Sequence, residues 1–216
     1  MQSSGQMTEH SVFLVTGASK GLGRSICELL ATKGYTIVGL ARESVELIEL
    51  DNYLKSHNSS SCAIVCDLSQ PKQIDKVANA IITQYPSING IIHNAGIIGP
   101  VGNIFTVDES KWNETLVVNL VSVQQLTRIL YPAMVNAGRC RVTTISSGAA
   151  VNSLESWSAY CTSKAGLDMW TRCLADEGKS DGISAVSIAP GIVDTDMQAT
   201  IRSADKADFP MVDRFI

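Results

Sequence analysis

The most constraining feature of this sequence is a regular alternation of short apolar runs with longer amphipathic segments. Continuous apolar runs rich in valine and isoleucine are typical of strands buried on both faces of a parallel sheet. Alternation of such strands with helices predicts an α/β fold, a doubly wound parallel sheet in a single domain with right-handed crossovers. The expected strands are residues 12–16, 35–40, 62–66, 88–93, 140–146 and 183–188, and the expected helices are 22–33, 44–57, 71–84, 108–136 and 157–178.

Individual residues indicate where two of these helices begin. Pro71 suits the first position of a helix because its fixed φ is already helical, and Ser69 is a candidate cap for the same helix. Asp108 is the expected cap of the long helix that follows it.

Length and composition exclude several classes of protein. The chain has 216 residues, which suits one domain, and 45% hydrophobic with 18% charged residues is typical of a globular chain. A net charge of −4 and 6% aromatic residues argue against a nucleic-acid partner. We expect a flexible polar tail at 1–10 and a folded domain over 11–216.

The six cysteines favour reduced thiols. Residues 1–10 lack the apolar segment of a signal peptide, and Cys62 and Cys66 have no second pair of metal ligands beside them. The apolar stretches are far shorter than the ~20 residues of a membrane-spanning helix. The sequence therefore predicts a cytoplasmic protein with no metal site and no membrane contact.

A glycine-rich segment follows the first expected strand, where residues 16–24 read TGASKGLGR. Such a turn between a strand and a helix lets backbone N–H groups approach a pyrophosphate closely. The segment lacks the Gly-Lys-Ser/Thr ending of a P-loop. The alternative is a strand–helix turn that binds no ligand. The residues expected to bind a dinucleotide here are Gly17, Ser19, Lys20, Gly21, Leu22 and Gly23.

Arg42 stands at the end of the second expected strand, where an NAD-selective protein places an acidic residue. Arg42 and Lys20 can both pair with a 2′-phosphate, which favours NADP(H) over NAD(H). Glu43 weakens this interpretation, and the alternative is two solvated surface cations.

Tyr160 and Lys164 lie four residues apart, so on a helix they share one face. A nearby ammonium stabilises a phenolate and lowers the tyrosine pKa, which suits a proton donor. The spacing alone is common in helices. Two further residues strengthen the interpretation: Ser147 directly follows the fifth expected strand, and Asn119 interrupts an apolar helix.

Seven motifs together resemble the single-domain branch of the short-chain dehydrogenase/reductase family. They occur in order over nearly the whole chain: TGASKGLG at 16–23, CDLS at 66–69, HNAG at 93–96, Asn119, ISS at 145–147, YCTSK at 160–164 and PGIVDTDM at 190–197. The stretch 148–197 is most similar to sepiapterin and benzil reductases. His93 departs from the asparagine that is more common in the family, and we interpret it as structural.

The resemblance implies roles for individual residues. Tyr160 would be the general acid, Lys164 would hold the nicotinamide ribose and lower the tyrosine pKa, Ser147 would bind the substrate carbonyl, and Asn119 would hold a relay water. Trp157 is a candidate substrate contact. The implied cofactor contacts are Asp67 and Leu68 at the adenine, Asn94, Ala95 and Gly96 at the adenosine ribose, and Pro190, Gly191, Ile192 and Thr195 at the nicotinamide.

The expected function is therefore an NADPH-dependent oxidoreductase of the Rossmann type that reduces the carbonyl group of a small-molecule ketone. One alternative is a catalytically silent NADP-binding sensor. An epimerase or dehydratase of the extended branch would need a larger substrate domain. The family further implies a homodimer or homotetramer. It also implies a seventh strand beyond Met197, so we expect the domain to be incomplete at its C-terminus.

Overall fold

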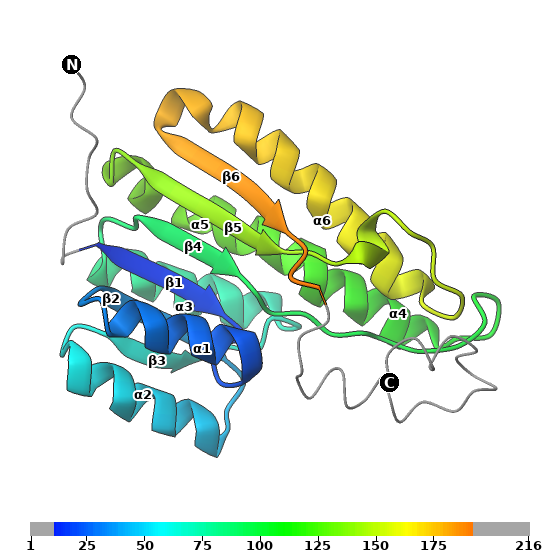
Figure 1. Ribbon diagram of the computed structural model, residues 1–216, viewed down its shortest axis with the longest axis horizontal. Coiled ribbons are helices and arrows are strands. Elements are labelled where there is room, and N and C mark those ends of the chain that lie inside the picture. Colours follow the sequence, from blue (N-terminus) through cyan, green and yellow to red (C-terminus); the bar gives the residue numbers. More distant parts are fainter. Residues whose placement is uncertain (1–10, 192–216) are drawn as a thin grey trace.

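The structure, a computed structural model, describes residues 11–191 as a six-stranded parallel sheet with helices on both faces (Figure 1). The strand order is β3-β2-β1-β4-β5-β6, which confirms the predicted doubly wound fold. The strands are β1 (Val12–Thr16), β2 (Thr36–Ala41), β3 (Cys62–Val65), β4 (Gly90–His93), β5 (Cys140–Ile145) and β6 (Ile183–Ile188). The predicted tail at 1–10, the implied contacts Ile192 and Thr195, and the expected C-terminal incompleteness concern residues outside the described range.

The helices follow the strands in the predicted order. They are α1 (Gly21–Ala31), α2 (Val45–His57), α3 (Pro71–Gln84), α4 (Glu109–Leu116), α5 (Ser122–Asn136) and α6 (Ser158–Glu177), with short 3-10 turns at η2 (Gly148–Ala150) and η3 (Lys179–Asp181). Figure 1 shows α1 and α2 in front of the sheet, with α3 and α5 behind it.

Several predicted helix and strand ends need correction. Ser69 does not cap α3; the N-cap is Gln70, which makes no capping bond with its side chain. Strand β4 begins at Gly90 rather than at residue 88, because the Ile88 N–H donates to the carbonyl of Ala133 and not to a neighbouring strand. Asp108 does cap its helix, accepting from the Lys111 N–H at 2.8 Å.

The predicted helix over 108–136 is divided by a π-helical turn, η1 (Val117–Val121). The N–H of Ser122 bonds to the carbonyl of Val117, five residues earlier, so the turn holds one residue more than an α-helical turn. This turn contains Asn119, whose side chain is fully buried.

The central strands are buried as the continuous apolar runs predict. All six residues of β2 are buried, and β1 is buried from Phe13 onward. The edge strand β3 is partly exposed. One apolar cluster lies between the sheet and α3 and α5, and a second lies between the sheet and α1 and α2. Both faces of the sheet are thus covered by apolar packing.

The strand order reverses between β1 and β4, two neighbouring strands that pair through Phe13, Leu14 and Val15. From β1 the chain first moves to β2 and β3 and then returns to β4 on the other side. Open sheets of this kind bind ligands in the crevice at the carboxyl ends of the strands, at that reversal.

All six cysteines fall within the described residues and carry free thiols. Burial raises the pKa of the Cys27 and Cys140 thiols to about 12 in each case. Across residues 11–191, no helix is both long and apolar enough to span a bilayer.

Candidate active site

The glycine-rich segment turns sharply between β1 and α1. Gly17 has φ +65° and Gly21 has φ +50°, values that side chains disfavour. A Cβ on Gly23 would collide with the carbonyl oxygen of Gly17, so only glycine allows α1 to approach the loop this closely. The N-cap of α1 is Lys20, which makes no capping bond with its side chain. The first N–H groups of α1 are therefore available to an anion.

Asn94 fixes this loop from behind. Its Nδ2 donates to the carbonyl oxygens of Thr16 at 3.0 Å and Gly17 at 3.2 Å. The Thr16 hydroxyl in turn accepts from the backbone N–H groups of Asn94 and Ala95. Asn94 therefore joins the ends of β1 and β4. Asn94 is not among the residues that line the groove described next.

A groove of about 530 Å³ runs along the carboxyl ends of the strands. It brings together eight residues predicted to bind a dinucleotide: Gly17, Ser19, Lys20, Arg42, Asp67, Leu68, Ala95 and Gly96. Gly21, Leu22 and Gly23 lie beside it in the first turn of α1. Pro190 and Gly191 follow β6, exposed, and do not line the groove.

Other residues that the sequence did not predict line the same groove. Ser44 comes from the N-cap of α2, and Glu114 and Val118 come from α4 and the π-helical turn. Their one sequence signal is their position on helices that follow β2 and β4.

Tyr160 and Lys164 lie on one face of α6, as their spacing predicts, and both are buried. The ammonium of Lys164 donates to the Ile145 carbonyl oxygen at 2.7 Å and lies 5.7 Å from the centre of the Tyr160 ring. A Cβ on Gly96 would lie 3.4 Å from Nζ of Lys164 and 3.4 Å from Oδ1 of Asn119. Gly96 thus connects the groove with the lysine.

Burial dominates the protonation of this pair. Desolvation lowers the pKa of Lys164 to about 8. Desolvation raises the pKa of Tyr160, and the hydrogen bond with Ser147 offsets part of that rise. The lowered tyrosine pKa expected from the spacing is therefore not found in this structure, because the loss of water outweighs the stabilisation of phenolate.

Ser147 stands next to Tyr160, at the end of β5. Its Oγ accepts from the Ala149 N–H at 3.2 Å, which caps the 3-10 turn η2, and it also bonds to Tyr160. Ser147 is only half-buried. Its hydroxyl can therefore meet the same ligand atom as the phenol of Tyr160.

Asn119 links three parts of the site. Its Oδ1 accepts from the Ile97 N–H at 2.8 Å, and its Nδ2 donates to the Ile97 carbonyl at 2.9 Å and to Ser163 Oγ at 2.9 Å. Ser163 donates to the carbonyl oxygen of Tyr160 at 2.8 Å. The amide thus holds the irregular segment after β4 against the helix that carries the tyrosine.

Trp157 supports the tyrosine ring. It is 3% exposed and meets Tyr160 edge to face, with 5.7 Å between ring centres and 88° between their planes. Ile98, Val101 and Leu154 pack against the same pair. Because so little of Trp157 is exposed, the structure shows it as packing for Tyr160.

His93 is a buried structural residue. Its Nε2 lies 2.8 Å from the Thr127 hydroxyl, and its ring meets Trp170 edge to face. Burial lowers the pKa of His93 to about 3, so its imidazole is neutral near pH 7. Across the described part of the chain, no group of three His, Cys, Asp or Glu side chains could hold a metal ion.

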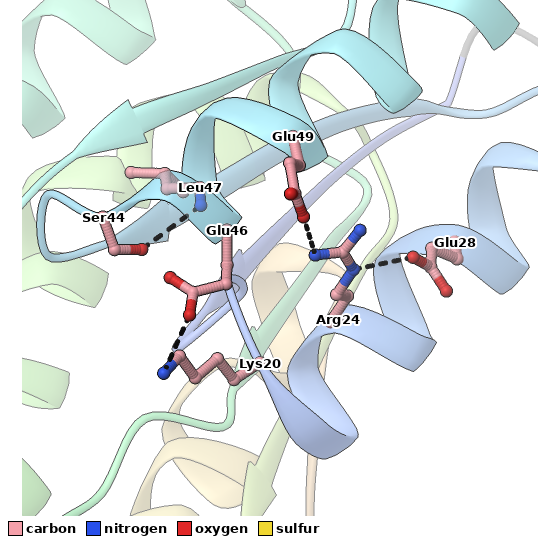
Figure 2. A network of polar contacts seen from close by, with 7 residues as sticks. All are labelled: Lys20, Arg24, Glu28, Ser44, Glu46, Leu47 and Glu49. Carbon is pink, nitrogen blue, oxygen red and sulfur yellow. Dashed lines mark hydrogen bonds and ion pairs between the residues drawn. The ribbon is translucent and has the colours of Figure 1, made fainter.

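Acidic residues of α1 and α2 pair with two basic residues, Lys20 of the glycine loop and Arg24 of α1 (Figure 2). Lys20 pairs with Glu46 at 3.0 Å, and Arg24 pairs with Glu28 at 2.8 Å and with Glu49 at 3.3 Å. Lys20 is therefore not simply a solvated cation, since it reaches from the glycine loop to the first turn of α2.

Comparison with known proteins agrees with this geometry. A family model described as short chain dehydrogenase matches residues 11–206. A benzil reductase ((S)-benzoin forming) from Bacillus cereus is 34% identical over 94% of this chain and 84% of the relative. A solved short chain dehydrogenase/reductase from Saccharomyces cerevisiae has a TM-score of 0.86 and 30% identity, covering 95% of this chain and 81% of its own. An Escherichia coli structure, a putative short chain dehydrogenase complexed with NADPH, has a TM-score of 0.82 and 27% identity, covering 92% and 84%.

Proposed function

Because the chain belongs to the short chain dehydrogenase family, and is thus an oxidoreductase acting on C=O or CH–OH groups, we propose that it is an NADPH-dependent ketone reductase with Tyr160 as the proton donor. The observation that carries the proposal is the cluster of Tyr160, Lys164 and Ser147 beside the groove. Gly96 lines the groove, and a Cβ on it would lie 3.4 Å from Nζ of Lys164, so the groove extends to the lysine.

The residues of the groove fit a nicotinamide dinucleotide. The glycine segment and the uncapped start of α1 suit a pyrophosphate, and Asp67 and Leu68 line the part where adenine would lie. Bound NADPH supplies the hydride, which no side chain of this protein can supply.

The protein's own residues position the carbonyl and deliver the proton. Ser147 and Tyr160 both offer a hydroxyl to the carbonyl oxygen, and Tyr160 donates its proton as negative charge develops there. Lys164 is held by the Ile145 carbonyl, so its charge stays near the phenol and stabilises the phenolate that remains. Asn119 keeps these elements together through Ile97 and Ser163.

Two basic residues support NADP(H) over NAD(H). Arg42 and Lys20 line the end of the groove where a 2′-phosphate would lie, and Arg42 stands in place of an acidic ribose partner. The Escherichia coli relative is described in complex with NADPH.

The substrate we propose is a small ketone, bound against Ser147, Tyr160 and the apolar residues around Trp157. The Bacillus cereus relative is named for the reduction of benzil, an aromatic diketone. We further propose a cytoplasmic homodimer or homotetramer formed through α5 and α6, where Tyr131 and Met169 are about half exposed.

Replacing Tyr160 by Phe tests the proposal. We expect the rate of NADPH oxidation with a diketone to fall about 10²–10⁴-fold, the usual contribution of a general acid. The dissociation constant of NADPH should stay within about twofold of the wild-type value, because Tyr160 is not among the residues that line the groove. Tyr53→Phe on α2, outside the lining of the groove, is the matched control and should keep full activity.

Two results would contradict the proposal. A Tyr160→Phe enzyme that keeps a tenth or more of the wild-type rate would show that another group donates the proton. A wild-type protein that binds NADPH but turns over no diketone, pteridine or steroid would favour the silent sensor.

A further inference from the structure

Glu46 lies beside the groove but is not part of its lining. Its Oε1 is 3.0 Å from Nζ of Lys20, which does line the groove, and the two side chains are 39% and 53% exposed (Figure 2). Glu46 stands in the first turn of α2, directly after the groove residues Arg42, Glu43 and Ser44. The pair therefore connects the glycine loop with the helix that follows the ribose-selecting position.

The carboxylate of Glu46 is firmly ionised. Its own backbone N–H, Lys20 and Ser44 together lower its pKa to about 2. Its position near the N-terminus of α2 favours the same charged form. At neutral pH a full negative charge thus holds the ammonium of Lys20.

We propose that Glu46 tunes coenzyme selection by competing with a 2′-phosphate for Lys20. This inference rests on the proposed binding of NADP(H) in the groove. A 2′-phosphate at the Arg42 end gains the full attraction of Lys20 only when the ammonium leaves Glu46. NADH has no 2′-phosphate and does not meet this cost. Glu46 is thus a specificity-determining residue that acts through Lys20 and lowers the preference for NADPH.

The size of the effect follows from the exposure of the pair. Exposed ion pairs are weak because water and salt screen them, so removing the attraction between Glu46 and Lys20 should tighten NADPH binding roughly two- to fivefold. The gain should shrink as ionic strength rises, since it is electrostatic.

The neighbouring ion pair provides a matched control. Glu49 lies one helical turn further along α2 and pairs with Arg24 at 3.3 Å, and neither Glu49 nor Arg24 lines the groove. Glu49→Gln removes the same charge from the same helix. If Glu46 acts through its contact with Lys20, and not through the overall negative charge of α2, Glu49→Gln leaves coenzyme selection unchanged.

The experiment measures dissociation constants of NADPH and NADH by titration calorimetry for wild type, Glu46→Gln, Glu49→Gln, Lys20→Gln and the double variant Lys20→Gln/Glu46→Gln. We expect Glu46→Gln to tighten NADPH roughly two- to fivefold and to leave NADH unchanged. When Lys20 is already replaced by Gln, the additional Glu46→Gln substitution should tighten NADPH binding much less than it does in the wild-type protein.

Each other outcome overturns the inference. No gain for NADPH, a loss, or an equal gain for NADH would show that Glu46 does not compete for Lys20. A gain that survives without Lys20, or that Glu49→Gln reproduces, would show a general charge effect. If the wild-type protein binds neither coenzyme, the proposed function is overturned as well. If the wild-type protein prefers NADPH, the proposed function stands even where the results for the variants overturn the role of Glu46.

Discussion

Replacing Asn119 by Ala removes the side chain that joins the segment after β4 to α6. Three hydrogen bonds are lost: one from the Ile97 N–H, one to the Ile97 carbonyl and one to Ser163 Oγ. The amide is fully buried, so in the native protein no water competes for these partners. The variant leaves both backbone groups of Ile97 without their partner.

The magnitude follows from what each partner retains. A buried polar group left without a partner costs about 1–3 kcal/mol. Ile97 is only half-buried, so water can reach it, and Ser163 keeps its bond to Tyr160. The lower end of the range applies to each group, which gives about 3 kcal/mol in total. For a domain of this size that corresponds to a fall of about 6–12 °C in Tm.

Urea and thermal unfolding of wild type and Asn119→Ala measure this loss. Asn136→Ala is the matched control, because its single bond to the Pro86 carbonyl at 2.8 Å is exposed and should be worth less than about 1 kcal/mol. If Asn119→Ala lost no more stability than Asn136→Ala, the buried clamp would not be a significant source of stability, and the reasoning would be wrong.

Two further predictions concern pH and the glycine loop. Burial lowers the pKa of His93 to about 3, below that of an unfolded histidine, so the unfolded state binds one more proton at mildly acidic pH. The contribution of His93 to the free energy of unfolding should be fully present above about pH 6.5 and should decrease as the pH falls. His93→Asn should therefore reduce the slope of the free energy of unfolding against pH by about 1.4 kcal/mol per pH unit between about pH 4 and 6. An unchanged slope in urea titrations would refute a neutral buried imidazole. Gly23→Ala should lose about 1–3 kcal/mol of stability and weaken NADPH binding, because the new Cβ meets the fixed carbonyl of Gly17. Gly148→Ala, where nothing lies within 4 Å, should lose less than about 0.5 kcal/mol, and equal losses would contradict the steric argument.

The fold was predictable because its signals are local. Strands buried on both faces must be apolar at successive positions, and β1 and β2 are buried almost throughout. The order of strands and helices then limits the chain to one parallel topology. The glycine loop was predictable for the same reason, since Gly17 and Gly23 are needed by backbone geometry that a sequence pattern reveals.

The less predictable features depend on contacts between distant residues. A hydrophobic period of 3.6 residues cannot reveal that the helix over 108–136 contains a π-helical turn at Val117–Val121. It therefore cannot show that Asn119 faces the backbone of Ile97. The ion pair between Lys20 and Glu46 joins the glycine loop to α2, and side-chain partners so far apart in the sequence leave no periodic signal.

The tyrosine pKa shows why the site cannot be derived from spacing alone. Four residues of separation on α6 predict that Lys164 lowers the pKa of Tyr160, but the same fold that brings them together also buries both. Burial destabilises the ammonium and the phenolate alike, which lowers the pKa of Lys164 and raises that of Tyr160. The carbonyl of Ile145, far away in the sequence, is what stabilises the ammonium in place. The protonation of this pair therefore depends on how β5 ends beside α6 as much as on the two residues themselves.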